Sequence, residues 1–150
     1  MNLKKKIRNI PDFPQRGIIF RDISPLLEDK KAFKYAIGCL AGKFKKLKVD
    51  KVVGIDARGF ILAGVLADRL KAGMVMIRKK GKLPHETESA QVELEYGKAT
   101  LEIHRDSIKP GERVLDLGCG GGLDLYFYSQ AVGREGKVYG VDISDGMVQR

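Results

Sequence analysis

Four basic side chains follow two of the apolar stretches that we expect to be strands. They are Arg58, after residues 51–55, and Arg78, Lys79 and Lys82, after residues 74–77. In open α/β sheets, ligands bind at the ends of parallel strands, where such turns meet. Guanidinium and ammonium groups gathered there suit a pyrophosphate, which offers many acceptor oxygens. A surface charge cluster is the alternative, but it does not explain why the cations directly follow two strands.

A glycine loop follows a third apolar strand, residues 113–117. Asp116, Gly118, Gly120 and Gly122 alternate with other residues there. Glycine permits backbone torsions and a close ligand approach that a β-carbon blocks, and the N–H groups that begin the next helix suit an anion or a ribose edge. A further apolar strand ends at Asp142, where an acid can bind the two ribose hydroxyls. The alternative is a structural strand–turn–helix unit that binds no ligand.

Strands and helices alternate along the chain, which predicts an α/β fold with a mostly parallel, Rossmann-like sheet and helices on both faces. Between Lys30 and Leu47 the apolar residues recur three or four apart, as on one face of a helix. A second helix is expected over Phe60–Lys71. Residues 86–96 are largely polar, and apolar and polar residues alternate only over Val92–Tyr96. We interpret this segment as an exposed, mobile hairpin or lid whose return strand is 100–104.

The composition fits one globular α/β domain over residues 1–150, since 43% of the residues are hydrophobic and 31% charged. The longest apolar stretch, Phe60 to Ala67, is far short of the ~20 residues that a membrane span needs. No apolar run follows Lys4–Lys6, so no secretory signal is expected. Two cysteines make no disulfide framework, which favours a cytoplasmic location.

The positive charge lies almost wholly in the first three quarters of the chain. Residues 1–112 carry a net charge of +10 and residues 113–150 a net charge of −1. A basic surface attracts nucleic acid, but these lysines are spread over helix faces without interleaved aromatic residues, so we expect neither a nucleic-acid nor a membrane partner. The sequence has no zinc-ligand spacing, serine–histidine–acid set or nucleophile elbow, and we expect no protein-held metal.

Residues 1–112 resemble the adenine phosphoribosyltransferases. The likeness rests on five segments: Pro11–Pro14, Gly17–Leu27, Ala57–Phe60, Ile77–Pro84 and Leu94–Gly97. The family joins adenine to phosphoribosyl pyrophosphate with Mg²⁺, giving AMP and pyrophosphate, and the resemblance implies a homodimer. Arg16 departs from the pattern, because it stands where the family often has proline.

The resemblance implies a role for each segment. Ile19, Phe20 and Arg21 would form the adenine pocket, with Phe20 stacked on the ring. Glu95 would handle the proton on N7 of adenine, with Tyr96 beside it. Arg58 would sit in the pyrophosphate loop, and the other three cations would neutralise the leaving group, which needs charge stabilisation. The catalytic candidates are therefore Glu95 and Arg58.

The resemblance stops at the boundary between Glu112 and Arg113, called the junction below. The family continues with a strand, two adjacent aspartates that hold the ribose hydroxyls, and a small-residue loop that cradles the 5′-phosphate. Gly118 and Cys119 stand in place of the aspartates, and Asp124, near the position of the phosphate loop, would repel a phosphate. Residues 113–150 instead resemble the first motif of class I S-adenosylmethionine-dependent methyltransferases, in which Asp142 would bind the ribose.

Three hypotheses follow. The chain is an adenine phosphoribosyltransferase-like scaffold that binds adenine or AMP with catalysis lost or very weak, a module that binds S-adenosylmethionine, or a folded chimera without a ligand. We interpret it as a constructed chimera of two related α/β architectures, because a natural fusion would more often keep both domains whole. The two parts, 1–112 and 113–150, are expected to share one sheet.

Overall fold

The structure is a computed structural model that describes residues 1–94, 97–119 and 122–142. Its contacts divide the chain into two compact units, Met1–Lys43 and Phe44–Arg150, which are described separately. The boundary between the units lies near the end of a helix, and the junction lies inside the second unit. No helix in the described part of the chain is long and apolar enough to cross a membrane.

The first unit contains a two-stranded antiparallel sheet, β1 (Arg8–Pro11) and β2 (Ile19–Asp22), after a short 3-10 helix, η1 (Leu3–Lys6). Two helices follow, α1 (Ser24–Glu28) and α2 (Lys30–Phe44), and a 3-10 turn, η2 (Lys45–Leu47), continues α2. The predicted helix over 30–47 is therefore confirmed. Asp29 caps α2, because its Oδ1 accepts hydrogen bonds from the N–H groups of Lys31 at 2.9 Å and Ala32 at 3.0 Å.

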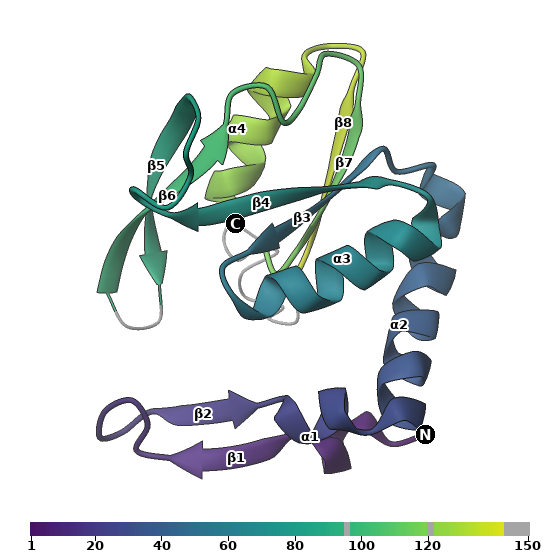
Figure 1. The fold of residues 1–150 in the computed structure, drawn as a ribbon, viewed down its shortest axis with the longest axis vertical. Coiled ribbons are helices and arrows are strands. Elements are labelled where there is room, and N and C mark those ends of the chain that lie inside the picture. Colours follow the sequence, from purple (N-terminus) through teal and green to yellow (C-terminus); the bar gives the residue numbers. More distant parts are fainter. Residues whose placement is uncertain (95–96, 120–121, 143–150) are drawn as a thin grey trace. The chain divides into compact units, whose positions relative to one another are not determined.

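The second unit is built on a six-stranded sheet in the order β5-β6-β4-β3-β7-β8 (Figure 1). Its strands are β3 (Lys51–Ile55), β4 (Gly73–Lys79), β5 (Thr87–Leu94), β6 (Gly97–His104), β7 (Arg113–Leu117) and β8 (Lys137–Val141). Strands β4, β3, β7 and β8 are parallel, and β5 and β6 form an antiparallel extension. Two helices complete the unit, α3 (Arg58–Leu70) and α4 (Leu123–Val132). The predicted α/β fold is confirmed.

The two helices cover opposite faces of the sheet. The β3–α3–β4 connection moves across the sheet in one direction and the β7–α4–β8 connection in the other. Since such crossovers are right-handed, opposite directions place their helices on opposite faces. Gly54 lets α3 approach β3, because a β-carbon there would lie 2.8 Å from Cβ of Ala63.

The hydrophobic core joins the two sides of the junction. Its buried members are Val53, Val75, Ile77, Val92, Leu101 and Ile108 from before the junction, and Val114, Tyr128 and Val132 from after it. Polar contacts also cross the junction: the backbone N–H of Arg113 donates to Asp50 Oδ2 at 2.8 Å, and the backbone N–H of Asp50 donates to the Arg113 carbonyl at 2.8 Å. Strand β7 is thus an internal strand of one continuous sheet.

Strands β5 and β6 form the hairpin that the sequence predicted, but β5 begins at Thr87 and is longer than the alternating pattern indicated. Val92 and Leu101 are buried, at 7% and 5% exposure, so the base of the hairpin belongs to the core. Its closure as a lid stays a prediction.

Candidate functional site

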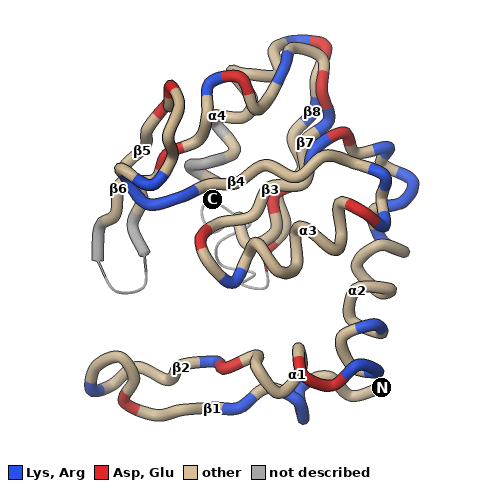
Figure 2. Tube along the Cα trace, viewed as in Figure 1, with Lys and Arg blue, Asp and Glu red and all other residues tan. Residues whose placement is uncertain are grey.

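Two cations at the end of β4 and just after it contact the carboxylate that follows β3. Asp56 Oδ2 lies 3.3 Å from Nε of Arg78 and 3.6 Å from Nζ of Lys82. The Asp56 side chain is 12% exposed, whereas the Lys82 side chain is 49% exposed. Figure 2 shows the basic run at the end of β4 in blue. The structure therefore brings together Arg78 and Lys82, as the sequence predicted, and adds Asp56, which sequence reasoning did not single out.

The turn of residues 78–82, called the cationic turn below, is held by backbone contacts as well. The N–H of Gly81 donates to Glu102 Oε2 at 2.8 Å, and the N–H of Lys80 donates to the Thr100 carbonyl at 3.0 Å. Arg78 Nη1 donates to the carbonyl of Lys82 at 3.0 Å. Glu102 is only 8% exposed, so it is a buried support for the turn that the sequence analysis also missed. Glu102 lies opposite Arg78 because β6 pairs with β4, and the sequence around Glu102 does not indicate this pairing.

The other two predicted pyrophosphate ligands are exposed. Arg58 begins α3, two residues after Asp56, and Lys79 is the last residue of β4. Parallel strands β3 and β4 end at the same edge of the sheet, so both residues lie at the edge occupied by the cationic turn.

The glycine loop closes on the end of β8. The N–H groups of Gly118 and Cys119 donate to the Val141 carbonyl at 2.6 and 3.2 Å, so the loop lies beside the residue that precedes Asp142. Gly122, at φ +80°, caps the start of α4 in a conformation that favours glycine. Gly120 lies outside the described residues. Gly118 therefore lies beside the end of β8, and ligand binding by Gly118 and Asp142 stays a prediction.

Asp116 lies inside the sheet rather than in the glycine loop. It is 0% exposed and pairs in register with Val53 on one side and Gly140 on the other. Because side chains alternate along a strand, Asp116 shares the face of Val114, which belongs to the core. A role for Asp116 in ligand binding stays a prediction, and its burial favours an indirect one.

The predicted adenine residues lie on β2 in the first unit. Side chains alternate along the strand, so Ile19 and Arg21 share one face and Phe20 faces the other. The Phe20 ring packs edge-on against Phe13 at 5.1 Å between centroids, and Arg21 Nη1 donates to Asn9 Oδ1. A single ligand on this strand would meet either the ring of Phe20 or the side chains of its two neighbours.

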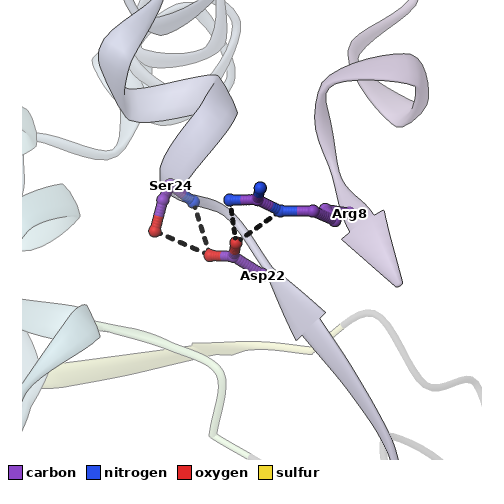
Figure 3. A network of polar contacts seen from close by, with 3 residues as sticks. All are labelled: Arg8, Asp22 and Ser24. Carbon is purple, nitrogen blue, oxygen red and sulfur yellow. Dashed lines mark hydrogen bonds and ion pairs between the residues drawn. The ribbon is translucent and has the colours of Figure 1, made fainter. Parts of the chain in front are cut away.

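Asp22 fixes the end of β2 to the start of α1 (Figure 3). Its Oδ2 accepts from Arg8 Nη2 at 2.7 Å, and its Oδ1 accepts from the Ser24 hydroxyl at 2.7 Å and the Ser24 N–H at 2.9 Å. These contacts lower the pKa of Asp22 to about 2, the Ser24 hydroxyl contributing most. The network holds the strand that carries the predicted adenine residues.

The catalytic candidate Glu95 and its neighbour Tyr96 fall between β5 and β6, outside the described residues. Among the residues that the structure describes, no three acidic, histidine or cysteine side chains gather where a metal ion could bind. The donors at the cationic turn are themselves cations around one paired carboxylate, so they do not fit a Mg²⁺ held by the protein.

Two protein families match the chain, in ranges that overlap. The phosphoribosyl transferase domain family matches residues 25–115. The chain belongs to the adenine phosphoribosyltransferase family. A methyltransferase domain family matches residues 108–150, in a short stretch that overlaps the first match. The overlap lies around the junction.

The relatives and solved structures agree with this membership. The adenine phosphoribosyltransferase of Trichlorobacter lovleyi is 49% identical over 140 residues, which cover 91% of this chain and 82% of that protein. That of Pelobacter propionicus is 56% identical over 114 residues, 76% of this chain and 66% of that protein. The Rhodothermus marinus enzyme structure superposes with a TM-score of 0.78 at 45% identity, covering 91% of this chain and 79% of that one. The Saccharomyces cerevisiae structure, which contains adenine, has a TM-score of 0.81 at 29% identity and covers 99% and 90%.

Proposed function

We propose that the chain is a purine-salvage scaffold of the adenine phosphoribosyltransferase type in which AMP synthesis is lost or very weak. In this proposal the cationic turn and Arg58 still bind pyrophosphate. Phe20 still stacks on adenine while the backbone groups of Ile19 and Arg21 read its edge, and Glu95 beside Tyr96 would still handle the adenine proton. The part that is replaced is the loop after β7, which would have held the ribose and its 5′-phosphate.

The loop after β7 carries the proposal. It stands at the point of the sheet where the strand order reverses, between β3 and β7, which is where open α/β sheets bind ligands. In place of two carboxylates it has Gly118 and Cys119, and both of their N–H groups already donate to Val141. Hydroxyl acceptors and phosphate donors are therefore both missing at these two positions. The match to the Trichlorobacter lovleyi protein is longer than the match to the Pelobacter propionicus protein, 140 against 114 residues, and its identity is lower, 49% against 56%. This is in keeping with a change of sequence after the junction.

The segments that the chain keeps from the family support binding of adenine and pyrophosphate without AMP synthesis. The yeast relative binds adenine in its crystal structure, and the cations of this chain are gathered as a pyrophosphate requires. Mg²⁺ would arrive with phosphoribosyl pyrophosphate, because the residues at the turn do not fit the ion. We also propose that the chain folds as one cooperative α/β domain, and that it forms the homodimer implied by the family.

S-adenosylmethionine binding is the second candidate, and one observation favours it. The methyltransferase match covers the glycine loop and Asp142, and the structure places Gly118 against the strand end before Asp142. Asp116 is fully buried, and the N–H groups of Gly118 and Cys119 already donate to Val141 of β8; both observations argue for the first candidate.

One assay and one titration series test the proposal. AMP formation from adenine, phosphoribosyl pyrophosphate and Mg²⁺ should be far below an ordinary turnover, since the loss of several kcal/mol of transition-state stabilisation at ~1.4 kcal/mol per factor of ten removes orders of magnitude. A turnover near ~1 s⁻¹ would refute it. Calorimetry on the same sample with adenine, AMP, pyrophosphate and S-adenosylmethionine should show heat for the first three. Heat with S-adenosylmethionine alone would select the second candidate, and no heat with any of the four would select a chimera without a ligand.

A further inference from the structure

The Asp56 carboxylate occupies the place that an anionic ligand of the cationic turn would take. A single oxygen, Oδ2, faces both Arg78 and Lys82, at 3.3 and 3.6 Å. Lys79 and Lys80 are exposed on the same turn, and Arg58 begins the helix two residues after Asp56. Like charges gathered this closely repel one another, and the carboxylate offsets part of that repulsion while no ligand is present.

The shape of the turn does not depend on Asp56. Its backbone is held by Glu102, through the Gly81 N–H, and by the Thr100 carbonyl, through the Lys80 N–H. Arg78 is also held by its own hydrogen bond to the Lys82 carbonyl at 3.0 Å. Two carboxylates therefore have different tasks at this turn: the buried Glu102 supports its backbone, and the Asp56 carboxylate contacts the charged side chains of Arg78 and Lys82.

We propose that Asp56 is an internal competitor of pyrophosphate, an inference that rests on the proposed function. Before binding, its carboxylate neutralises the cations that the ligand needs, and after binding it remains as a like charge beside the ligand. Both effects weaken the retention of pyrophosphate and speed its release. Asp56 thus acts through Arg78 and Lys82 as a positioning residue, and it gives the turn a resting partner between ligands.

Titration with inorganic pyrophosphate tests this directly. Asp56→Asn keeps the shape of the side chain and removes its charge, so it should tighten binding about tenfold, which corresponds to about 1.4 kcal/mol, with a slower release. Asp68→Asn is the matched control. It makes the same charge change on an exposed residue ten positions along α3 from Arg58, about 15 Å away at the helical rise, and should leave affinity within about twofold because the exposed charge is largely screened at that range. Equal or weaker binding by Asp56→Asn would overturn the inference.

Two further variants separate charge from packing. Asp56→Glu keeps the charge and should keep near-wild-type affinity; if it tightens binding as much as Asp56→Asn, the effect is steric and the inference fails. In a Lys82→Gln background the gain from Asp56→Asn should shrink, because one of the two cations for which Asp56 competes is gone. An undiminished gain would also overturn it.

The result for the wild-type chain distinguishes the two proposals. If wild type binds pyrophosphate and Asp56→Asn binds it no more tightly, only the role of Asp56 fails. If neither protein binds pyrophosphate, the proposed pyrophosphate site fails and the competitor role fails with it. Melting curves for each variant show whether the chain is folded. If Asp56→Asn does not fold, Asp56→Ser, which also removes the charge, takes its place in every comparison, and equal or weaker binding by Asp56→Ser would overturn the inference.

Discussion

The cationic turn before the junction and the glycine loop after it lie at the same edge of one sheet, yet they are built in different ways. The turn gathers charged side chains around Asp56 and anchors its backbone on Glu102. The glycine loop uses its backbone on the neighbouring strand, since the N–H groups of Gly118 and Cys119 both donate to the carbonyl of Val141 at the end of β8. The first arrangement presents charge to a ligand, and the second completes the fold around β8.

This difference shows why one sheet can combine the two. Strand pairing is a backbone property, so β7 pairs with β3 and β8 in register whatever loop follows it. Function depends on the side chains of the loops, which the sheet only positions. Under the proposed function, an exchange at β7 would keep the fold of the family and remove the part of the ligand site that binds the ribose and its 5′-phosphate.

The largest expected effect tests whether the two sides of the junction form one structure. A β-carbon on Gly136 would lie 2.3 Å from Cβ of Val132 and 2.7 Å from the Glu112 carbonyl, which is backbone. Gly136→Ala should therefore lower the free energy of unfolding by about 3 kcal/mol, as over-packing does. Thermal melting followed by circular dichroism measures it.

Gly54→Ala is the counterpart before the junction, where the new β-carbon would meet Ala63 Cβ at 2.8 Å. Both variants should lower the melting temperature of one single transition. Gly42→Ala, on α2, should not destabilise the chain, because no atom lies within 4 Å of the added β-carbon. A second transition that only one variant shifts would mean that the two sides unfold separately.

The next largest effect tests whether pyrophosphate binds to the cationic turn rather than to any basic surface. Arg78→Gln should weaken pyrophosphate by about 2 kcal/mol, the scale of a hydrogen bond to a charged group. Arg69→Gln, at the other end of α3, removes the same charge and should change little. Isothermal titration calorimetry measures the dissociation constant of pyrophosphate for both variants. Equal losses of affinity would mean that pyrophosphate responds to the overall positive charge of the protein and not to the cationic turn.

Much of the sheet could be predicted, because local patterns mark it. Apolar residues at helical spacing marked α2, and the β-branched run of β3 marked a buried strand. Strand β1 was missed, since Arg8-Asn9-Ile10-Pro11 has no alternation and becomes a strand only by pairing with β2. The length of β5 was underestimated because Thr87, Glu88 and Ser89 are polar on both faces and pair through β6 alone.

The site was predictable only in part, for a related reason. Cations after strands are visible in the sequence, and so is the glycine spacing. The roles of Asp56 and Glu102 depend on which strands become neighbours, since Glu102 reaches the turn only because β6 pairs with β4. Asp116 looked like part of the glycine motif, but its place within β7 buries it completely.

A smaller effect concerns the glycine loop alone. If this loop binds S-adenosylhomocysteine, Asp142→Ala should weaken it by about 1.5 kcal/mol, the low end for a hydrogen bond to a charged group. The same substitution should leave pyrophosphate binding unchanged, because Asp142 follows β8 and the cationic turn follows β4. Fluorescence or calorimetric titration with both ligands checks this. Unchanged S-adenosylhomocysteine binding, or none in wild type, removes the methyltransferase-like candidate.

The smallest expected effect lies in the first unit, at the two acids that hold its elements. The pKa of Asp22 is lowered to about 2 by the Ser24 hydroxyl, the Ser24 N–H and Arg8, and the pKa of Asp29 is lowered to about 2 by Lys6 and the N–H groups that it caps. A carboxyl whose folded pKa lies below its unfolded value of 3.8 stabilises the fold above that value and loses this contribution as the pH falls toward 2. Asp22→Asn should therefore lower the melting temperature slightly at pH 7 and make no difference near pH 2.

The control is Asp106→Asn, which removes an exposed acid from the second unit. Hydrogen exchange between pH 5 and pH 2, corrected for intrinsic rates, should show β1 and β2 losing protection before β7 and β8, since the first unit depends on carboxylates and the junction region on buried apolar contacts. Equal loss in both regions, or a pH-independent effect of Asp22→Asn, would contradict this. Acid would then destabilise β1 and β2 no more than β7 and β8. Only the cationic turn and the glycine loop would still distinguish the two sides of the junction.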